Sequence, residues 1–141
     1  MSTAGALALV PLLSPGLAIT ATTADAGPLT GKYVEVAGWP KLPPGVEMGE
    51  TSAVDVDNDG HVFAFHRPGR GFEPDATALL TDPTVLEIDP DSGKLVRSWG
   101  ANTFLVPHGL TIDRHNNVWT TDVGLQQVFK FSHDGDRKSV V

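Results

Sequence analysis

The 141-residue chain contains no cysteine, which excludes disulfide bonds, thiolate metal sites and cysteine nucleophiles. Basic residues are also few, since 10 Lys and Arg stand against 17 Asp and Glu and give a formal net charge of −7. This deficit argues against a nucleic-acid-binding module and against binding to an anionic membrane surface, because both depend largely on basic side chains. The chain has no sustained helical period and no apolar run of the roughly 20 residues that a membrane-spanning helix needs.

What the sequence does contain is typical of a globular β protein. Hydrophobic residues make up 40% and charged residues 19% of the chain, which is not the composition of a disordered segment. Glycine (15) and proline (11) are both abundant. Their excess indicates many turns and therefore many short strands.

The longest apolar run lies near the N-terminus, at residues 6–19 (ALALVPLLSPGLAI). It fits the apolar part of a signal peptide, and residues 24–26 (ADA) fit a cleavage site. We therefore predict a signal peptide at 1–26 and a secreted or periplasmic protein. No Lys or Arg precedes Lys32, so a leader without a targeting role is the alternative. Residues 27–49 are predicted to form a Pro-rich connector.

Strand signals follow the connector. Residues 53–57 (AVDVD) alternate apolar and polar side chains, and residues 61–65 (HVFAF) predict the returning strand of a hairpin. The segment DNDG at 57–60 matches the start of a calcium loop but lacks the glutamate at the twelfth position, so we predict a turn there. A second hairpin is predicted at 84–99.

The pattern then recurs, with strand segments predicted at 109–113, 118–122 and 127–131. Val54 and Leu110 mark equivalent positions in the two copies, and so do Val85 and Val128. The interval between the first pair is longer than the interval between the second pair. The first copy therefore contains an insertion, and residues 68–82 are its predicted location.

Four short strands per repeat, at a period of about 40–45 residues, indicate the blades of a β-propeller. We predict an all-β fold with two blades, at about 50–100 and 101–141. Propellers close with about four to eight blades, so this propeller would be incomplete and the chain would be a fragment or would assemble with others. A single β-sandwich, which the length permits, is the alternative.

Several segments resemble one family. Residues 106–113 (VPHGLTID), 117–123 (NVWTTDV) and 127–131 (QVFKF) resemble the peptidyl-α-hydroxyglycine α-amidating lyases, and so does the strand at 62–67, which ends in FHR. The resemblance extends over about residues 50–135. It implies a six-bladed propeller built from NHL repeats, of which this chain would hold the N-terminal portion.

The resemblance also implies an activity and two metal ions. These lyases are zinc-dependent and split a peptide ending in α-hydroxyglycine into a peptide amide and glyoxylate, and a calcium ion ties their blades together. On this basis His108 corresponds to a zinc ligand and Arg67 to the arginine that helps hold the substrate's carboxylate. Val54 and Leu110 correspond to the residues whose backbone carbonyls bind calcium.

The remaining family site residues would belong to the missing blades. These are two further zinc histidines, a tyrosine base and a calcium-binding aspartate, so we expect this chain to be inactive alone. Tyr33 is the only tyrosine and precedes the first blade, so we do not assign it the role of base. Residues 67–69 read RPG where animal members read RGD, a departure next to the proposed substrate contact.

Each of these assigned site roles has a simpler structural alternative. His108 could be a hydrogen-bonded structural histidine, and Arg67 a solvated arginine at a strand end. Because side chains alternate along a strand, His66 should face away from Arg67. Three histidines in turns, His61, His115 and His133, are expected to be solvated, whereas Asp122 is expected to cap backbone groups.

Three functions remain open on the sequence. The first is the lyase, as part of a longer exported protein. The second is a non-catalytic NHL propeller that binds a peptide or protein partner, since a fold does not determine a function. The third is a truncated product without activity.

Overall fold

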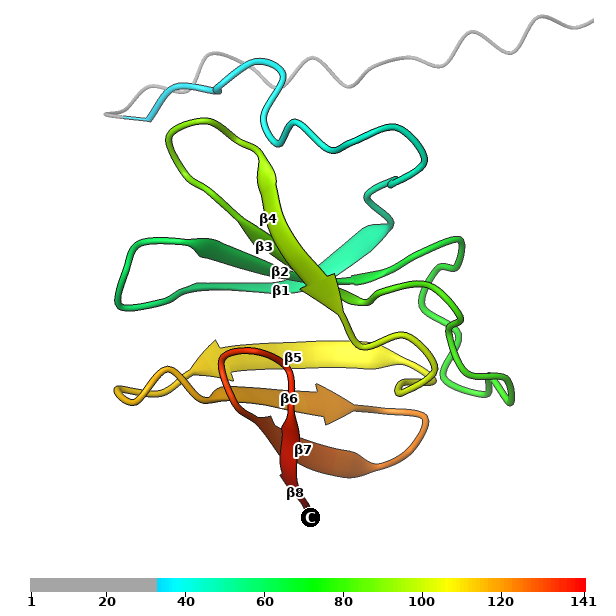
Figure 1. Cartoon of the computed structure of the whole chain (residues 1–141). Helices are drawn as coiled ribbons and strands as arrows, with labels where there is room; N and C mark the ends of the chain where they lie inside the picture. Colours follow the sequence, from blue (N-terminus) through cyan, green and yellow to red (C-terminus); the bar gives the residue numbers. More distant parts are fainter. Residues whose placement is uncertain (1–32) are drawn as a thin grey trace, which may run out of the picture. The chain divides into compact units, whose positions relative to one another are not determined.

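The computed structural model describes residues 33–141 (Figure 1). The predicted signal peptide at 1–26 and the first part of the connector lie outside the described residues. Within the described range, no helix has both the length and the apolar character needed to span a membrane.

Eight strands form two antiparallel sheets of four (Figure 1). The first sheet has the order β1 (Glu50–Val56), β2 (Val62–Arg67), β3 (Val85–Ile88) and β4 (Leu95–Trp99). The second has the order β5 (Pro107–Ile112), β6 (Val118–Asp122), β7 (Gln127–Phe131) and β8 (Arg137–Val140). The prediction of an all-β fold with two four-stranded blades is confirmed, and strands β1 to β7 lie within a few residues of their predicted segments.

The two sheets begin with the same turn. In the first, Asp57 Oδ1 accepts hydrogen bonds from the backbone N–H groups of Asp59 and His61, at 2.9 and 2.8 Å. In the second, Asp113 Oδ1 accepts from the N–H groups of His115 and Asn117, at 2.9 and 3.0 Å. The interval between the two aspartates equals the interval between Val54 and Leu110, so the sequence repeat is also a structural repeat. DNDG forms the predicted turn.

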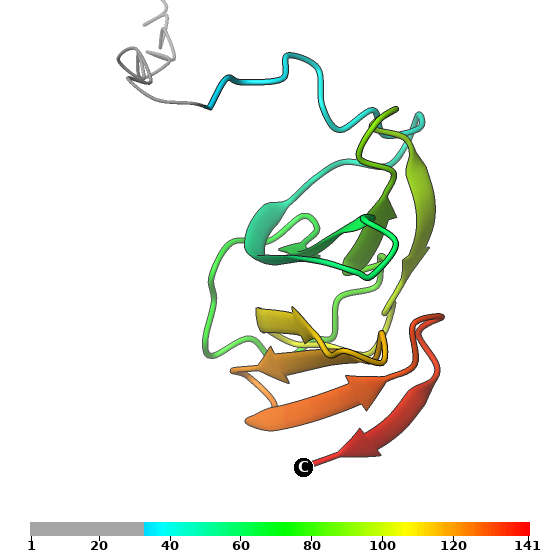
Figure 2. The same ribbon diagram turned by 90° about the vertical axis from the view of Figure 1, so that its left-hand side faces the viewer.

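Side chains along β2 alternate between two hydrophobic clusters. Phe63 and Phe65 are fully buried in a cluster shared with the second sheet, whereas Ala64 packs in a separate cluster on the opposite face. This alternation follows from the two-residue period of a strand. Figure 2 shows the two sheets stacked. The shared cluster draws its side chains from both of them.

The shared cluster is centred on a residue outside the strands. Phe104, in the connection between β4 and β5, is fully buried. Its ring centroid lies 4.9 Å from that of Phe65 and 5.2 Å from that of Phe129, both in edge-to-face geometry. Phe104 therefore joins the two sheets through aromatic contacts, which prefer this geometry.

The last part of the predicted connector packs against the first sheet. Four of its apolar side chains cover the face opposite the second sheet, namely Trp39, Leu42, Val46 and Met48. The backbone N–H of Lys41 also donates to the carbonyl of Gly93 at 2.7 Å. This segment therefore contributes a hydrophobic cover to the first sheet, which its Pro-rich composition did not indicate.

Candidate functional site

His108 occupies a β-bulge. Pro107 pairs with Asp122 and Gly109 pairs with Thr121, so His108 is an extra residue between two paired ones. The equivalent bulge in β1 lies between Thr51 and Ala53. Bulges bend a strand and redirect its side chains, and they are common near active sites.

The residue after His108 has to be small. The backbone N–H of Gly109 donates to Thr121 Oγ1 at 2.9 Å, and a Cβ atom at position 109 would lie only 2.8 Å from that oxygen. Glycine therefore permits the close approach of β5 and β6 beside the bulge. The side chain of His108 is exposed.

Arg67 lies at the end of β2 and contacts the bulge directly. It is only 7% exposed. One terminal nitrogen donates to the carbonyl of Pro107 at 2.7 Å, and the other donates to Glu50 Oε2 at 3.0 Å. The Nε atom is buried without a hydrogen-bond partner. Arg67 is thus a buried cation held next to the residue that precedes His108, rather than a solvated arginine at a strand end.

Phe72 contacts both Arg67 and His108 and so brings them into one site. It belongs to the loop between β2 and β3, where the sequence predicted the insertion, and it is 51% exposed. The guanidinium carbon of Arg67 lies 5.5 Å from the centroid of its ring. The imidazole of His108 lies 6.1 Å away, edge to face. The sequence analysis did not select Phe72, although an aromatic residue in a glycine-rich insertion was a usable signal.

Arg70 fixes this loop over the site. Its guanidinium donates to the carbonyls of Ala78, in the same loop, and of Leu105, before β5, both at 3.0 Å. These two bonds hold the loop against the start of the second sheet. Arg67, Phe72 and His108 together form what we call the bulge site.

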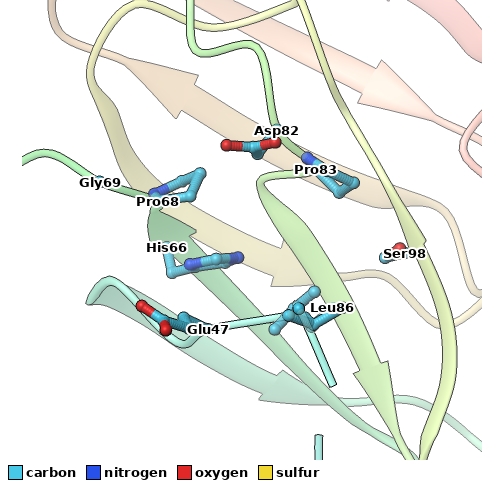
Figure 3. A pocket seen from close by; sticks show the side chains of 10 residues that line it. Glu47, His66, Pro68, Gly69, Asp82, Pro83, Leu86 and Ser98 are labelled. Carbon is cyan, nitrogen blue, oxygen red and sulfur yellow. The ribbon is translucent and has the colours of Figure 1, made fainter. Parts of the chain in front are cut away.

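His66 faces away from the bulge site, as the alternation predicts. Its Nδ1 atom accepts a hydrogen bond from the backbone N–H of Gly49 at 3.0 Å. Burial lowers the pKa of His66, although the carbonyl of Pro83 opposes this shift, so the imidazole is neutral near pH 7. His66 lines a cavity of about 260 Å³. Figure 3 shows its imidazole among the lining side chains, which include Glu47 and Asp82.

Val54 and Leu110 lie at equivalent places in β1 and β5. Val54 pairs with Ala64, and Leu110 pairs with Thr120. The two strands are linked through Asp55, whose Oδ2 accepts from the backbone N–H of Ile112 at 2.8 Å. Burial opposes the shift, but hydrogen bonds from Ile112, Val56 and Thr111 lower the pKa of Asp55. β1 and β5 therefore lie side by side as the first strands of neighbouring sheets.

Two of the three turn histidines do not behave as expected. His61 Nδ1 lies 2.9 Å from Glu87 Oε1, and His133 Nε2 lies 2.8 Å from Asp57 Oδ2. Both side chains are half-buried, so the expectation that they are solvated is wrong. These contacts arise because the turns approach carboxylates on other elements, which sequence position alone does not reveal. His115 is exposed, as expected.

Asp122 caps backbone groups, and that prediction is confirmed. Its Oδ2 atom accepts from the backbone N–H groups of Leu105 and Val106 at 2.8 and 2.9 Å. Its Oδ1 atom accepts from the N–H of Leu125 at 2.8 Å. A buried carboxylate is satisfied here by three donors. The segment before the His108 bulge is therefore fixed in place.

The bulge site by itself does not amount to a zinc site. A catalytic zinc usually has three protein ligands and one open position. Within residues 33–141, His108 belongs to no group of three or more His, Asp or Glu side chains close enough to share an ion. The described residues therefore supply fewer than three ligands at this place, and no reaction step can be assigned to a metal held by them alone.

Curated relatives share the family resemblance found in the sequence. No family model matches the chain. Over 118 residues it is 36% identical to peptidyl-alpha-hydroxyglycine alpha-amidating lyase 1 of Drosophila melanogaster, an alignment covering 76% of this chain and 21% of the relative. It is 35% identical over 109 residues to lyase 2 of the same organism, covering 70% and 26%. The chain is a relative of the α-amidating lyases.

A third relative agrees with the first two. The probable peptidyl-alpha-hydroxyglycine alpha-amidating lyase pgal-1 of Caenorhabditis elegans is 35% identical over 97 residues, covering 62% of this chain and 27% of that protein. The chain thus spans about a quarter or less of the α-amidating lyases that it matches. Its two sheets are the two propeller blades predicted from the sequence.

Proposed function

We propose that this chain supplies two blades of a lyase that cleaves peptidyl-α-hydroxyglycine to a peptide amide and glyoxylate. The observation that carries the proposal is the contact between Arg67 and the carbonyl of Pro107, at 2.7 Å. It holds a buried guanidinium beside the imidazole of His108. These are the two side chains that the resemblance assigns to the substrate carboxylate and to zinc.

Arg67 would bind and orient the substrate. A guanidinium has five N–H donors, and Pro107 and Glu50 occupy two of them. A carboxylate at the C-terminus of the substrate could pair with the donors that remain. Glu50 is a competing anion, so the substrate would have to share or displace its contact with Arg67. Phe72 would cover the bound group from the loop side and limit the access of water.

His108 would be one of three zinc ligands, and the other two would come from outside the described residues. A zinc ion at such a site supplies positive charge that favours the loss of a proton from a hydroxyl group. A structural calcium ion would bind the backbone carbonyls of Val54 and Leu110. We expect the chain alone not to release glyoxylate at a useful rate, because residues 33–141 bring no further ligands close enough to His108 to complete the zinc site.

A chimera tests this proposal directly. Residues 50–135 would replace the aligned segment of the Drosophila lyase 1, and glyoxylate release from an α-hydroxyglycine peptide would be measured. We expect activity in the chimera and a loss of at least about 100-fold in its R67A and H108A variants, as for removal of a group that stabilises charge in an active site. His115→Ala, at an exposed turn, is the matched control.

The outcomes separate the candidate functions. H108A should also lower the zinc content, measured by elemental analysis, whereas R67A should leave it unchanged. A chimera that folds and retains zinc but releases no glyoxylate would contradict the lyase proposal. It would favour a non-catalytic NHL propeller that binds a peptide or protein partner.

We also propose that the protein is exported, on the basis of the apolar run at 6–19 and the small residues at 24–26. Expression in a bacterium followed by mass spectrometry of the exported fraction tests this. The expected mature chain begins at Gly27. Recovery only of an uncleaved chain from the cytoplasm would contradict export.

A further inference from the structure

Three side chains from different elements converge beside the contact between the two sheets. Asp57 follows β1, Glu87 lies in β3, and His133 lies in the turn between β7 and β8. One ligand atom of each lies within 4.8 Å of the others. The side chains of Asp57 and Glu87 are essentially buried, at 0% and 1% exposed. Two buried carboxylates so close together require compensating positive charge.

Each carboxylate has one oxygen fixed by the protein and the other directed into the cluster. Asp57 Oδ1 accepts from two backbone N–H groups in its turn, which leaves Oδ2 at 2.8 Å from His133 Nε2. Glu87 Oε2 accepts from Arg97 Nε at 2.8 Å and lies 2.8 Å from a terminal guanidinium nitrogen of the same residue. Its Oε1 lies 2.9 Å from His61 Nδ1. Hydrogen bonds and ion pairs from protein groups to the ligand side chains orient metal ligands in this way in proteins.

His61 provides an independent indication. Its Nδ1 atom is buried and has no aligned hydrogen bond, although it lies 2.9 Å from Glu87 Oε1 and 3.6 Å from Asp57 Oδ2. This imidazole nitrogen lies in ion-pair range of two carboxylate oxygens but in hydrogen-bond alignment with neither, an arrangement that suits a shared metal ion. Tetrahedral zinc has bonds of about 2.0–2.1 Å, which place neighbouring ligand atoms about 3.3 Å apart. The observed spacings of 2.8, 2.9 and 3.6 Å bracket that value.

We propose that Asp57, Glu87 and His133 bind a divalent zinc ion, with His61 as a fourth donor. Mixed imidazole and carboxylate ligands suit zinc, whereas calcium and magnesium prefer oxygen ligands alone. Since His133 belongs to the second sheet and the carboxylates to the first, the ion joins the sheets. Its role is structural, and the proposal does not depend on lyase activity.

Zinc titration of the full chain tests the site. The H108A variant serves as the background, so that any zinc bound at the bulge site is excluded. We expect about one equivalent of zinc after dialysis against metal-free buffer and a higher thermal unfolding midpoint with zinc than without, because a ligand that binds only the folded state stabilises it. Calcium and magnesium should give neither effect.

Conservative variants identify the ligands. His133→Gln and Glu87→Gln should each weaken zinc binding at least about tenfold, whereas His115→Ala should leave it unchanged. Circular dichroism confirms that each variant is folded. Unchanged zinc binding in folded ligand variants would overturn the proposal.

A second test leaves the residues of the cluster unchanged and uses cobalt(II) as the probe. Cobalt(II) bound to the H108A background should show the visible absorption of a tetrahedral site, and zinc should displace it. Failure of this protein to bind either ion would mean that the cluster is a network of hydrogen bonds and ion pairs only, which would overturn the metal site.

Discussion

Replacing Phe104 by alanine tests whether one loop residue holds the two sheets together. Phe104 is fully buried, and its ring meets those of Phe65, Phe129 and Phe131 at centroid distances of 4.9, 5.2 and 6.0 Å. Core Phe→Ala substitutions cost about 3–5 kcal/mol, because apolar contacts are lost and a cavity remains. Three aromatic neighbours place this site at the upper end of that range. A domain is stable by only about 5–15 kcal/mol, so the loss is a large share of the total.

Urea unfolding, followed by tryptophan fluorescence, measures this loss. With a slope of about 1.5 kcal/mol per M, the midpoint of F104A should fall by about 2–3 M. Phe72→Ala removes the same side chain from a site that is 51% exposed, so it should lower the stability by less than about 1 kcal/mol. Equal losses in the two variants would refute the view that Phe104 joins the sheets.

Three further substitutions probe the framework around the sites. Asp122→Ala leaves three backbone N–H groups without their acceptor and should cost about 3 kcal/mol, measured by urea unfolding. Gly135→Ala should destabilise by about 1–3 kcal/mol, because φ is +88° and a Cβ atom would lie 2.8 Å from the ring of Trp99; an unchanged midpoint would contradict this. The pKa of Asp113 is lowered below its ordinary value of 3.8, first by the hydrogen bond from Trp119, so this carboxylate stabilises the fold above about pH 4. Asp113→Asn should therefore lose stability at pH 7, and its difference from the native chain should shrink as the pH falls below about 4.

The strands were predictable because they depend on the local pattern of side chains along the sequence. The alternation along residues 53–65 and the turn residues between them identify a hairpin without any knowledge of the remaining chain. The correspondence between Val54 and Leu110 then placed a second copy. The cap provided by Asp122 was also predictable, because Asp122 resembles the aspartate common in NHL blades.

Contacts between distant segments were not predictable in the same way. His61 and His133 lie in polar turns, and a local reading places both in solvent. Their actual partners are Glu87 and Asp57, which lie on other elements far away along the chain. Glu87 carries a charged side chain in the middle of β3, yet it is 1% exposed. Its burial results from the approach of His61 and Arg97, which only the folded sheets bring together.

The bulge at His108 limits what could be predicted from the sequence about the directions of the side chains at the bulge site. Strand alternation predicts which face a side chain takes, but one unpaired residue shifts every following side chain to the other face. The motif at 106–113 therefore identified His108 without determining its direction. Arg67, in the regular strand β2, could be assigned a face opposite His66 from alternation alone. The site thus combines a regular strand with an interrupted one, and the loop residue Phe72 contacts both.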